Sequence, residues 1–352
     1  MKIKVVVFDS DAGFLKRLAA AFQKKYEDKI SLRMFSDEEA MYASLQKARA
    51  DIVLAEQTLC VDTEKLASET VQGYLCDVPD VQEIDGVPAV CKYQKVEDIY
   101  KRILNIYADH SADIQFQNHE SDGQTVLFTS VQGGGGTSTA AAAWAVRMAG
   151  EGKKVFYLNL ERMGDAELYF SGDGGLSFSD VIYALKSRNG NLGLRLESII
   201  ETDVSGVEFF HTCKNAYDMF ELKDRELEEL IQTIFRVRRY DAVILDISGE
   251  LTDRQLKLMR EIADKIIYIS DGSMTGNRKF EKFCEVIRVM EQRKEAHILD
   301  KTVLLYNRYS SRTGRQLEKT AVPVLGGIHR VEGLAGKELI QRVSKEEALG
   351  RI

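Results

Sequence analysis

A strand that leads into four glycines and then into an alanine-rich helix constrains this chain more than any other feature. Residues 125–131 are mostly apolar and β-branched, Gly133–Gly136 follow them, and a helical pattern extends from about Thr137 to Ala149. Glycines let backbone N–H groups turn inward, and a helix N-terminus adds a positive end, so this arrangement is suited to holding phosphate. A flexible glycine turn before an ordinary helix is the alternative for this segment.

Strand-like and helix-like segments alternate on both sides of a polar, acidic stretch at 111–123. This alternation is typical of a parallel sheet with helices on both faces. We therefore expect two doubly wound α/β domains, at 1–110 and 124–352, joined by a linker at 111–123. The expected strands are 4–8, 30–35, 51–55, 73–76, 87–91, 125–131, 154–160, 207–211, 240–247, 266–270, 302–307 and 322–328. The expected helices include 38–48, 96–107, 137–149, 224–237 and 336–349.

Composition and charge exclude several classes of protein. The chain has 352 residues, of which 48 are basic and 55 acidic, and its formal net charge of −7 argues against a protein that coats nucleic acid. A membrane span needs about 18 or more apolar residues in a row, and the sequence has no such run. Its five cysteines are scattered without a CxxC pair, as is typical of reduced thiols. We expect a cytoplasmic protein with no specific nucleic acid partner.

The last expected helix carries a short apolar stripe, which could lie on a membrane surface or pack on its own domain. Its residues are Leu339, Ile340, Val343 and Leu349, and acidic residues interrupt them. We therefore favour packing on the domain, and we expect at most a peripheral association with a membrane.

The glycine turn departs from the general phosphate-loop motif, Gly-x-x-x-x-Gly-Lys-[Ser/Thr], at two positions. Val131 stands in place of the first glycine, and Thr137 stands in place of the lysine. Ser138 occupies the position whose hydroxyl can ligate Mg²⁺, although it could instead cap the helix. A search for this motif alone would therefore reject the chain.

The same loop resembles the deviant Walker A sequence of the ParA/MinD family, Lys-Gly-Gly-x-Gly-Lys-[Ser/Thr]-Thr. Gly133, Gly134 and Gly136 match that pattern. Gln132 stands where the family has its signature lysine, and Thr137 replaces the second lysine.

Residues 158–170, which include the end of the second expected strand of this domain, resemble one branch of that family, the TadZ/CpaE pilus-assembly proteins. The branch has the sequence Asp-Leu-Asp-x-x-x-Gly-Asp-x-x-x-Tyr. Gly164, Asp165 and Tyr169 match it, whereas Asn159 and Glu161 replace the two aspartates. Loops of this branch often lack the second lysine as well.

Two further strands complete the resemblance, which spans about 125–330. Residues 239–247 are similar to the Tyr-Asp-x-Val-Val-x-Asp strand, which makes Asp246 the Walker B carboxylate, with a strand-end turn residue as the alternative. Residues 305–308 are similar to the strand whose asparagine reads adenine; here that residue is Asn307, with a turn residue as the alternative.

The resemblance implies a domain that binds ATP and Mg²⁺. It implies Ser138 and Asp246 as Mg²⁺ ligands, and Glu161 as a carboxylate that orients a water, with a solvated loop acid as an equal alternative. The residues implied in nucleotide binding are Gln132, Gly133, Gly134, Gly135, Gly136, Thr137, Ser138, Thr139, Asn307 and Arg308.

The missing lysines predict weak or absent hydrolysis. Phosphoryl transfer depends mainly on positioning and on neutralising the charge of the phosphates, which neither Thr137 nor Gln132 can do. A charge-assisted hydrogen bond contributes about 1.5–3 kcal/mol, against about 1 kcal/mol for a neutral one. Backbone amides, Ser138 and Mg²⁺ remain, so nucleotide binding can persist without turnover.

Residues 1–108 resemble the receiver domain of response regulators, in which two acids hold Mg²⁺ and an aspartate accepts phosphate. Asp9 keeps the first acid, Ser10 replaces the second, and Glu56 stands at the acceptor position. Lys92 matches the family's lysine, and Asp11 completes the candidate pocket. We expect a docking or dimerising module that is not phosphorylated. Strand-end acids in an unrelated α/β domain are the alternative.

Taken together, the resemblances imply an ATP-binding, weakly or non-hydrolysing scaffold that localises assembly of a Flp/Tad-type pilus secretion machine. They further imply a homodimer, partners among pilus-assembly and secretion proteins, and a place at the cell pole through those partners. Two alternatives stay open. One is an active ParA/MinD-type ATPase in DNA partitioning or division-site placement, and the other is a response regulator switched by phosphorylation.

Overall fold

The computed structural model describes residues 2–59, 61–79, 81–110, 123–187, 190–294, 297–309 and 314–352. The chain divides into two compact units. The first comprises Met1–Gln115 and Arg188–Ser198, and the second comprises Phe116–Ser187 and Ile199–Ile352. The predicted linker lies outside the described residues except for Gly123. The predicted boundaries did not anticipate that Arg188–Ser198 would join the first unit.

The first unit contains a six-stranded sheet with the order β2-β1-β3-β4-β6-β5, in which all neighbours are parallel except β5 and β6. Its elements are β1 (Ile3–Phe8), α1 (Ala12–Tyr26), β2 (Ile30–Phe35), α2 (Glu38–Lys47), β3 (Ile52–Glu56), β4 (Val71–Cys76), β5 (Glu83–Ile84), β6 (Val87–Cys91) and α3 (Val96–His110). The short strand β5, which forms a hairpin with β6, was not predicted.

The helices of the first unit follow from apolar spacing and capping. The side chain of Asp11 caps α1 by accepting a hydrogen bond from the N–H of Phe14 at 2.9 Å. The apolar stripe of α1, from Phe14 to Phe22, is buried, and α1 also packs against α3. Met41 of α2 is buried in a cluster that includes Val6 and Val53 of the sheet.

Helix α6 (Leu192–Ile199) was not predicted, and most of it belongs to the first unit. Glu197 of this helix is only 2% exposed and pairs with Lys29. The hydroxyl of Tyr100 donates to the same carboxylate at 3.1 Å. A buried carboxylate needs such partners, so these contacts account for the position of α6 in the first unit.

The second unit contains an eight-stranded sheet with the order β14-β13-β12-β7-β11-β8-β10-β9, parallel except between β9 and β10. Its strands are β7 (Gln124–Thr129), β8 (Val155–Asn159), β9 (Glu201–Thr202), β10 (Glu208–Phe209), β11 (Ala242–Asp246), β12 (Lys265–Ser270), β13 (Thr302–Tyr309) and β14 (Val324–His329). The α-helices of the second unit are α4 (Thr137–Gly150), α5 (Phe178–Ser187), α7 (Asp218–Glu221), α8 (Asp224–Val237), α9 (Asp253–Lys257), α10 (Met274–Lys294) and α11 (Gly336–Val343). The predicted fold class, α/β with parallel sheets, is confirmed for both units.

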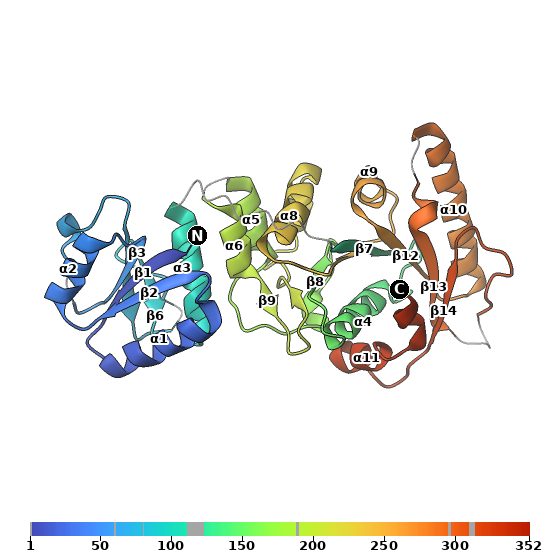
Figure 1. Cartoon of the computed structure of the whole chain (residues 1–352). Coiled ribbons are helices and arrows are strands. Elements are labelled where there is room, and N and C mark those ends of the chain that lie inside the picture. The colour runs from blue at the N-terminus through green and yellow to red at the C-terminus, as the bar shows by residue number, and fades with distance from the viewer. Residues whose placement is uncertain are drawn as a thin grey trace. The chain divides into compact units, whose positions relative to one another are not determined.

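Strand β7 lies inside this sheet, with β11 and β8 added on one side and β12, β13 and β14 on the other. Ligands of open α/β sheets bind beyond the carboxyl end of such a strand, where the order of strands changes direction. Figure 1 shows α4 and α11 on one face of the sheet and α8 and α9 on the other. The helix that follows β7 is α4, whose residues 140–146 are all buried.

The single helix predicted at 336–349 is wrong in its length. Helix α11 ends at Val343, and a short 3-10 helix, Glu347–Arg351, follows. The hydroxyl of Ser344 donates to the carbonyl of Gln341 at 2.9 Å, and a serine bond of this kind competes with helix continuation. Ile340, Val343 and Leu349 are buried against the core, which supports packing on the domain.

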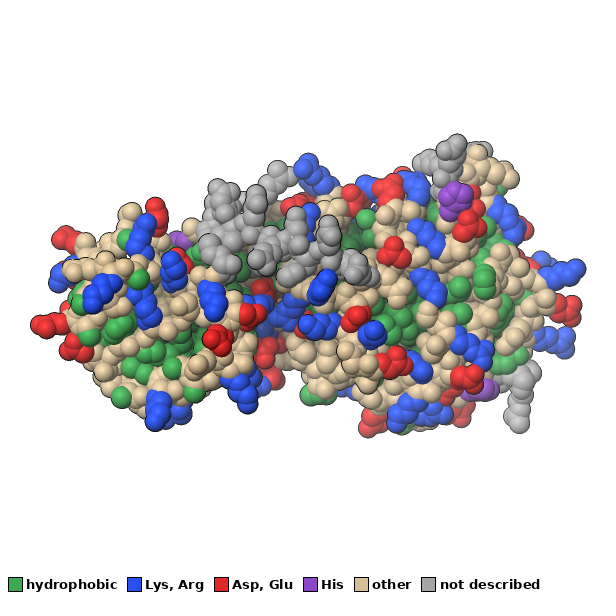
Figure 2. Space-filling view, in the orientation of Figure 1, with side chains coloured by type: hydrophobic (Ala, Val, Ile, Leu, Met, Phe, Trp, Pro, Cys, Tyr) green, Lys and Arg blue, Asp and Glu red, His purple; other side chains and the backbone are tan. Residues whose placement is uncertain are grey.

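Among the described helices, none combines the length and apolar content needed to span a membrane. On the face that Figure 2 shows, Lys and Arg side chains alternate with Asp and Glu side chains over each unit.

Candidate functional site

The glycine loop after β7 borders a cavity of about 460 Å³ in the second unit. Every loop residue from Ser130 to Thr139 lines it, so the structure brings together the predicted residues from Gln132 to Thr139. Glu161, which follows β8, and Ile247–Glu250, which follow β11, complete the lining with Tyr169. The volume of this cavity is within the range of small-molecule sites.

Parallel pairing explains why distant residues meet at this cavity. Asp246 at the end of β11 lies opposite Phe128 of β7 on one side and Asn159 of β8 on the other. The carboxyl ends of parallel strands share one edge of the sheet. Residues that end or follow these three strands therefore collect around the glycine loop.

The carboxyl group of Asp246 is completely buried. Its Oδ2 accepts a hydrogen bond from the hydroxyl of Tyr157 at 2.6 Å, and among the described residues its Oδ1 has no partner with hydrogen-bond geometry. Burial and the nearby charge of Glu161 raise the pKa of Asp246 to about 7, although the hydroxyls of Tyr157 and Ser138 oppose this shift. An unpartnered, buried carboxylate oxygen beside a glycine loop is a fitting donor for a cation.

Glu161 and Ser138 stand close to the same point. Burial raises the pKa of Glu161, and a hydrogen bond from the Ser138 hydroxyl opposes that rise. The N-cap of α4 is Gly136 rather than Ser138, so the serine hydroxyl is not the helix cap. Ser138, Glu161 and Asp246 thus offer one hydroxyl and two carboxylates in one place.

This donor set fits Mg²⁺ that arrives with phosphate. Among the described residues, no group of three or more His, Cys, Asp and Glu side chains could hold a metal ion by itself. Mg²⁺ characteristically takes one or two carboxylates and completes its shell with waters and substrate phosphates. The arrangement is therefore suited to a cation shared between the chain and a nucleotide.

Similar loops carry lysine at two positions, which are Gln132 and Thr137 in this chain. The two side chains have different surroundings. Thr137 is half-buried and lines the cavity as the first residue of α4. Gln132 lies against the start of α10, where a Cβ on Gly276 would come within 2.5 Å of both Gln132 Oε1 and Asp271 Oδ1. The side chain of Gln132 therefore contacts its own chain.

Asn307 and Arg308 reach the glycine loop from the end of β13. The Asn307 Nδ2 donates to the carbonyls of Gly135 and Gly136 at 3.1 and 3.0 Å. The Arg308 Nη1 donates to the carbonyl of Gly134 at 2.9 Å. Both predicted residues thus meet the loop through its carbonyl groups.

Tyr157 and Gly249 are among the contributors to this site that were not predicted from the sequence. Tyr157 lies within β8, and its contact with Asp246 depends on the pairing of β8 with β11. Gly249 follows β11, and a Cβ there would lie 1.5 Å from the carbonyl oxygen of Ser130. The signal for Gly249 was its position just after the expected strand 240–247, which carries Asp246 next to its last residue.

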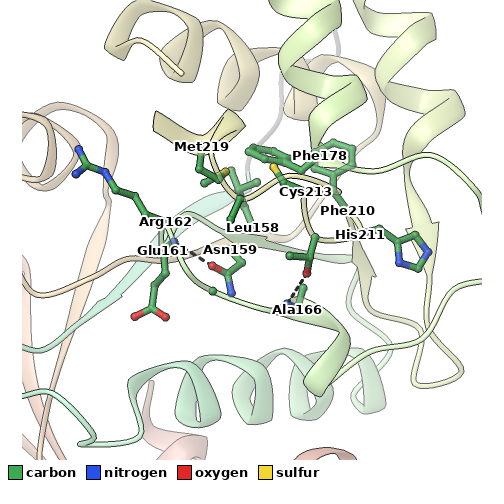
Figure 3. A pocket seen from close by; sticks show the side chains of 13 residues that line it. Leu158, Asn159, Glu161, Arg162, Ala166, Phe178, Phe210, His211, Cys213 and Met219 are labelled. Atoms are coloured by element: carbon green, nitrogen blue, oxygen red, sulfur yellow. Dashed lines mark hydrogen bonds between the residues drawn. The ribbon is translucent and has the colours of Figure 1, made fainter. Parts of the chain in front are cut away.

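A small apolar recess lies beside the Glu161 segment, and Figure 3 shows the side chains around it. The Glu161 carboxylate points away from the apolar side chains of Leu158, Phe178 and Cys213. Asn159 accepts a hydrogen bond from the N–H of Glu161 at 3.0 Å and so shapes this turn. The recess holds only about 30 Å³, which is room for about one water and not for a substrate.

The first unit has a second polar cluster, where the receiver-like pocket was predicted. The Lys92 Nζ lies 3.2 Å from Asp9 Oδ2 and 3.6 Å from Glu56 Oε1. Glu56 Oε2 accepts hydrogen bonds from the N–H and hydroxyl of Ser10 at 3.1 and 2.6 Å. Asp11 caps α1 and makes no ion pair with Lys92 among those that the described residues form.

Asp77, which follows β4, is the residue of this cluster that the sequence analysis missed. Its Oδ1 lies 3.1 Å from Lys92 Nζ. Burial opposes charge on Lys92, but hydrogen bonds to Asp77 and Asp9 and the nearby carboxylates outweigh it and raise the pKa of Lys92. Hydrogen bonds from Ser10 lower the pKa of Glu56. Both pKa shifts favour the charged forms, an ammonium on Lys92 and a carboxylate on Glu56.

This cluster is expected to resist phosphorylation. Incubation with acetyl phosphate and Mg²⁺ should leave the intact mass of the chain unchanged, because the Glu56 carboxylate already accepts two bonds from Ser10. Glu56→Asp is the matched comparison, since it restores the ordinary acceptor type. A stoichiometric, metal-dependent gain of one phosphoryl group by the wild-type chain would refute this expectation.

Comparison with known proteins describes both parts of the chain. The family "TadZ-like, receiver domain" matches residues 1–108. No curated protein matches the sequence. The crystal structure of a ParA family ATPase from Chlorobium tepidum is similar with a TM-score of 0.52 and 17% identity, covering 65% of this chain and 95% of that one.

Two further solved structures are similar. The septum site-determining protein MinD from Pyrococcus horikoshii, complexed with Mg-ADP, has a TM-score of 0.48 and 19% identity, over 65% of this chain and 91% of that one. The MinC:MinD cell division protein complex from Aquifex aeolicus has a TM-score of 0.48 and 15% identity, over 63% and 86%. We base the assignment of a ParA-type ATPase fold on the Chlorobium tepidum structure.

Proposed function

We propose that this chain, which joins a TadZ-like receiver domain to a domain of the ParA/MinD ATPase fold, binds Mg-ATP and serves as a scaffold for pilus assembly. The observation that carries the nucleotide site is the glycine-lined cavity, with Ser138, Glu161 and Asp246 gathered beside the loop. The receiver family carries the pilus role, because TadZ-like proteins belong to pilus assembly.

The phosphates of ATP would be held mainly by backbone amides of residues 133–139 and by the N-terminus of α4. Ser138 and Asp246 would hold Mg²⁺, which would supply charge neutralisation that neither Gln132 nor Thr137 can provide. The Tyr157 hydroxyl fixes one oxygen of Asp246 and leaves the other available to the cation shell. Glu161, which lines the same cavity, would orient a water.

Hydrolysis would be slow, because the loop itself contributes no cation to the transition state. Thr137 can donate one neutral hydrogen bond, and Gln132 is engaged with the start of α10. Each factor of ten in rate corresponds to about 1.4 kcal/mol of barrier. Replacing two charged contacts by neutral ones therefore lowers turnover by orders of magnitude.

A protein that stays bound to ATP is suited to marking one fixed site in the cell. A protein that cycles between nucleotide states is less suited to that role. We propose a homodimer in the cytoplasm that recruits the pilus-assembly and secretion proteins and is held at the cell pole through those partners. Light scattering on the full chain, with and without Mg-ATP, tests the dimer, and a monomer under all conditions would contradict it. Loss of the protein with normal pilus formation would contradict the assembly role.

The nucleotide site is tested by isothermal titration with Mg-ATP and by ATP turnover of the same preparation. The wild-type chain should bind with an affinity that depends on Mg²⁺ and should turn over slowly. Ser138→Ala should lose about tenfold or more in affinity with Mg²⁺ present and little in its absence. Ser31→Ala, an exposed serine of the first unit, is the control.

Two outcomes would overturn this proposal. Absence of ATP binding by the wild-type chain would remove the nucleotide site altogether. Turnover as fast as that of a lysine-bearing ParA/MinD ATPase would favour an active, cycling enzyme over a scaffold.

A further inference from the structure

Three consecutive carbonyl groups of the glycine loop are held from one side by β13. Arg308 donates to the carbonyl of Gly134, and Asn307 donates to those of Gly135 and Gly136. The Gly136 carbonyl also accepts the N–H of Ala140, the first bond of α4. The end of β13 therefore sets the orientation of successive peptide planes in the loop.

Fixing a carbonyl also fixes the next N–H. In a trans peptide the C=O and the N–H of the following residue point in opposite directions, and the described residues contain no cis bond. Holding the carbonyls of residues 134–136 toward β13 therefore directs the N–H groups of residues 135–137 away from it. These residues line the cavity, where such N–H groups form an anion-binding concavity.

The contact is tight and uses strained backbone. A Cβ on Gly136 would lie 2.4 Å from Asn307 Nδ2, so the amide is seated directly against a residue without a side chain. Arg308 has a φ of 55°, one of two positive values among the described non-glycine residues. Such a conformation is strained for a residue with a side chain and persists where surrounding contacts impose it, often at functional sites.

We propose that Asn307 and Arg308 are positioning residues that hold this lysine-free loop in its phosphate-binding conformation. The inference rests on the proposed nucleotide site and extends it. A loop with lysines can gain much of its affinity from charge, whereas this loop depends on the preset direction of its amides. Two side chains of β13 provide that direction and so replace part of what the lysines would contribute.

The Asn307 amide is already fully used by its own chain. Its Nδ2 contacts two loop carbonyls, and its Oδ1 accepts the N–H of Arg308 at 3.0 Å. Its side chain is buried. If Asn307 positions the loop, its replacement should weaken the binding of any polyphosphate. If Asn307 contacted adenine instead, its replacement should weaken the binding of ATP only.

Arg308→Gly is the sharpest variant, because it removes the Arg308 side chain at a position whose positive φ glycine adopts without strain. Titration with Mg-ATP and with Mg-triphosphate, which has no base or sugar, should show about a tenfold weaker affinity for both ligands. The melting temperature should not fall. Arg330→Ala removes a comparable exposed arginine beyond β14, whose side chain pairs with Glu332, and is the control.

A second measurement does not need a ligand. In the free protein, the ¹⁵N order parameters of Gly135 and Gly136 should fall in Arg308→Gly and in Asn307→Ala, from about 0.85 toward about 0.6. Unchanged order parameters would overturn the inference, as would a loss of affinity confined to ATP. Failure of the wild-type chain to bind either ligand would contradict the proposed function, while the order parameters would still decide the positioning role.

Discussion

A Gly249→Ala variant is expected to lose nucleotide binding and to melt roughly 10 °C below the wild-type chain. The added Cβ would lie 1.5 Å from the carbonyl oxygen of Ser130 and 2.2 Å from its carbonyl carbon. Both are backbone atoms at the start of the glycine loop, so no side chain can move aside. The strand end or the loop must shift, and overpacking of this kind costs about 3 kcal/mol or more.

The control for this variant is Gly133→Ala in the same loop. A Cβ on Gly133 would meet no heavy atom within 4 Å, and its φ is not in the left-handed region. Its melting temperature should therefore stay close to that of the wild-type chain. Differential scanning calorimetry and titration with Mg-ATP measure the two effects. A Gly249→Ala chain with wild-type melting and affinity would show that the end of β11 does not approach the loop as described.

Thr137→Lys is expected to raise ATP turnover by about tenfold. Thr137 begins α4 and lines the cavity, at the position that carries a lysine in similar loops. A lysine there replaces a neutral hydrogen bond by a charge-assisted one, a gain of about 1–2 kcal/mol. Negative charge grows on the leaving group during phosphoryl transfer, so this interaction lowers the barrier and raises the rate.

Thr137→Met is the matched control, since it adds a chain of similar length without charge. Turnover should be measured at saturating Mg-ATP, so that a change in affinity does not enter the rate. If Thr137→Lys and Thr137→Met have the same turnover as the wild-type chain, the missing lysine is not what limits hydrolysis.

Local patterns were sufficient to predict most of the elements. The expected strand at 30–35 and the expected helix at 224–237 coincide with β2 and α8. Side-chain periodicity reports which face of a segment is buried, and that information is contained in neighbouring residues. The last helix was predicted too long because a bond from Ser344 to its own backbone does not change the apolar pattern.

Part of the candidate site was also predictable. Gln132–Thr139 are adjacent in the chain, and Asp246 ends a strand that apolar residues mark clearly. Parallel strands in an α/β domain place their carboxyl ends together, so a strand-end acid can be assigned to the same edge as a glycine loop. Whether these residues bind ATP and Mg²⁺ stays a prediction.

Other features depend on which segments become neighbours, and no local pattern carries that information. The order of strands brings Tyr157 to Asp246 and Gly249 to Ser130. Burial of Glu197 beside Tyr100 and Lys29 assigns most of α6 to the first unit, although the predicted boundaries placed this segment in the second domain. The residues that bend a glycine loop can be read from sequence, because backbone freedom is a property of each residue. The direction of its amides depends on Asn307 and Arg308, which lie about 170 residues away and meet the loop only through the register of β13.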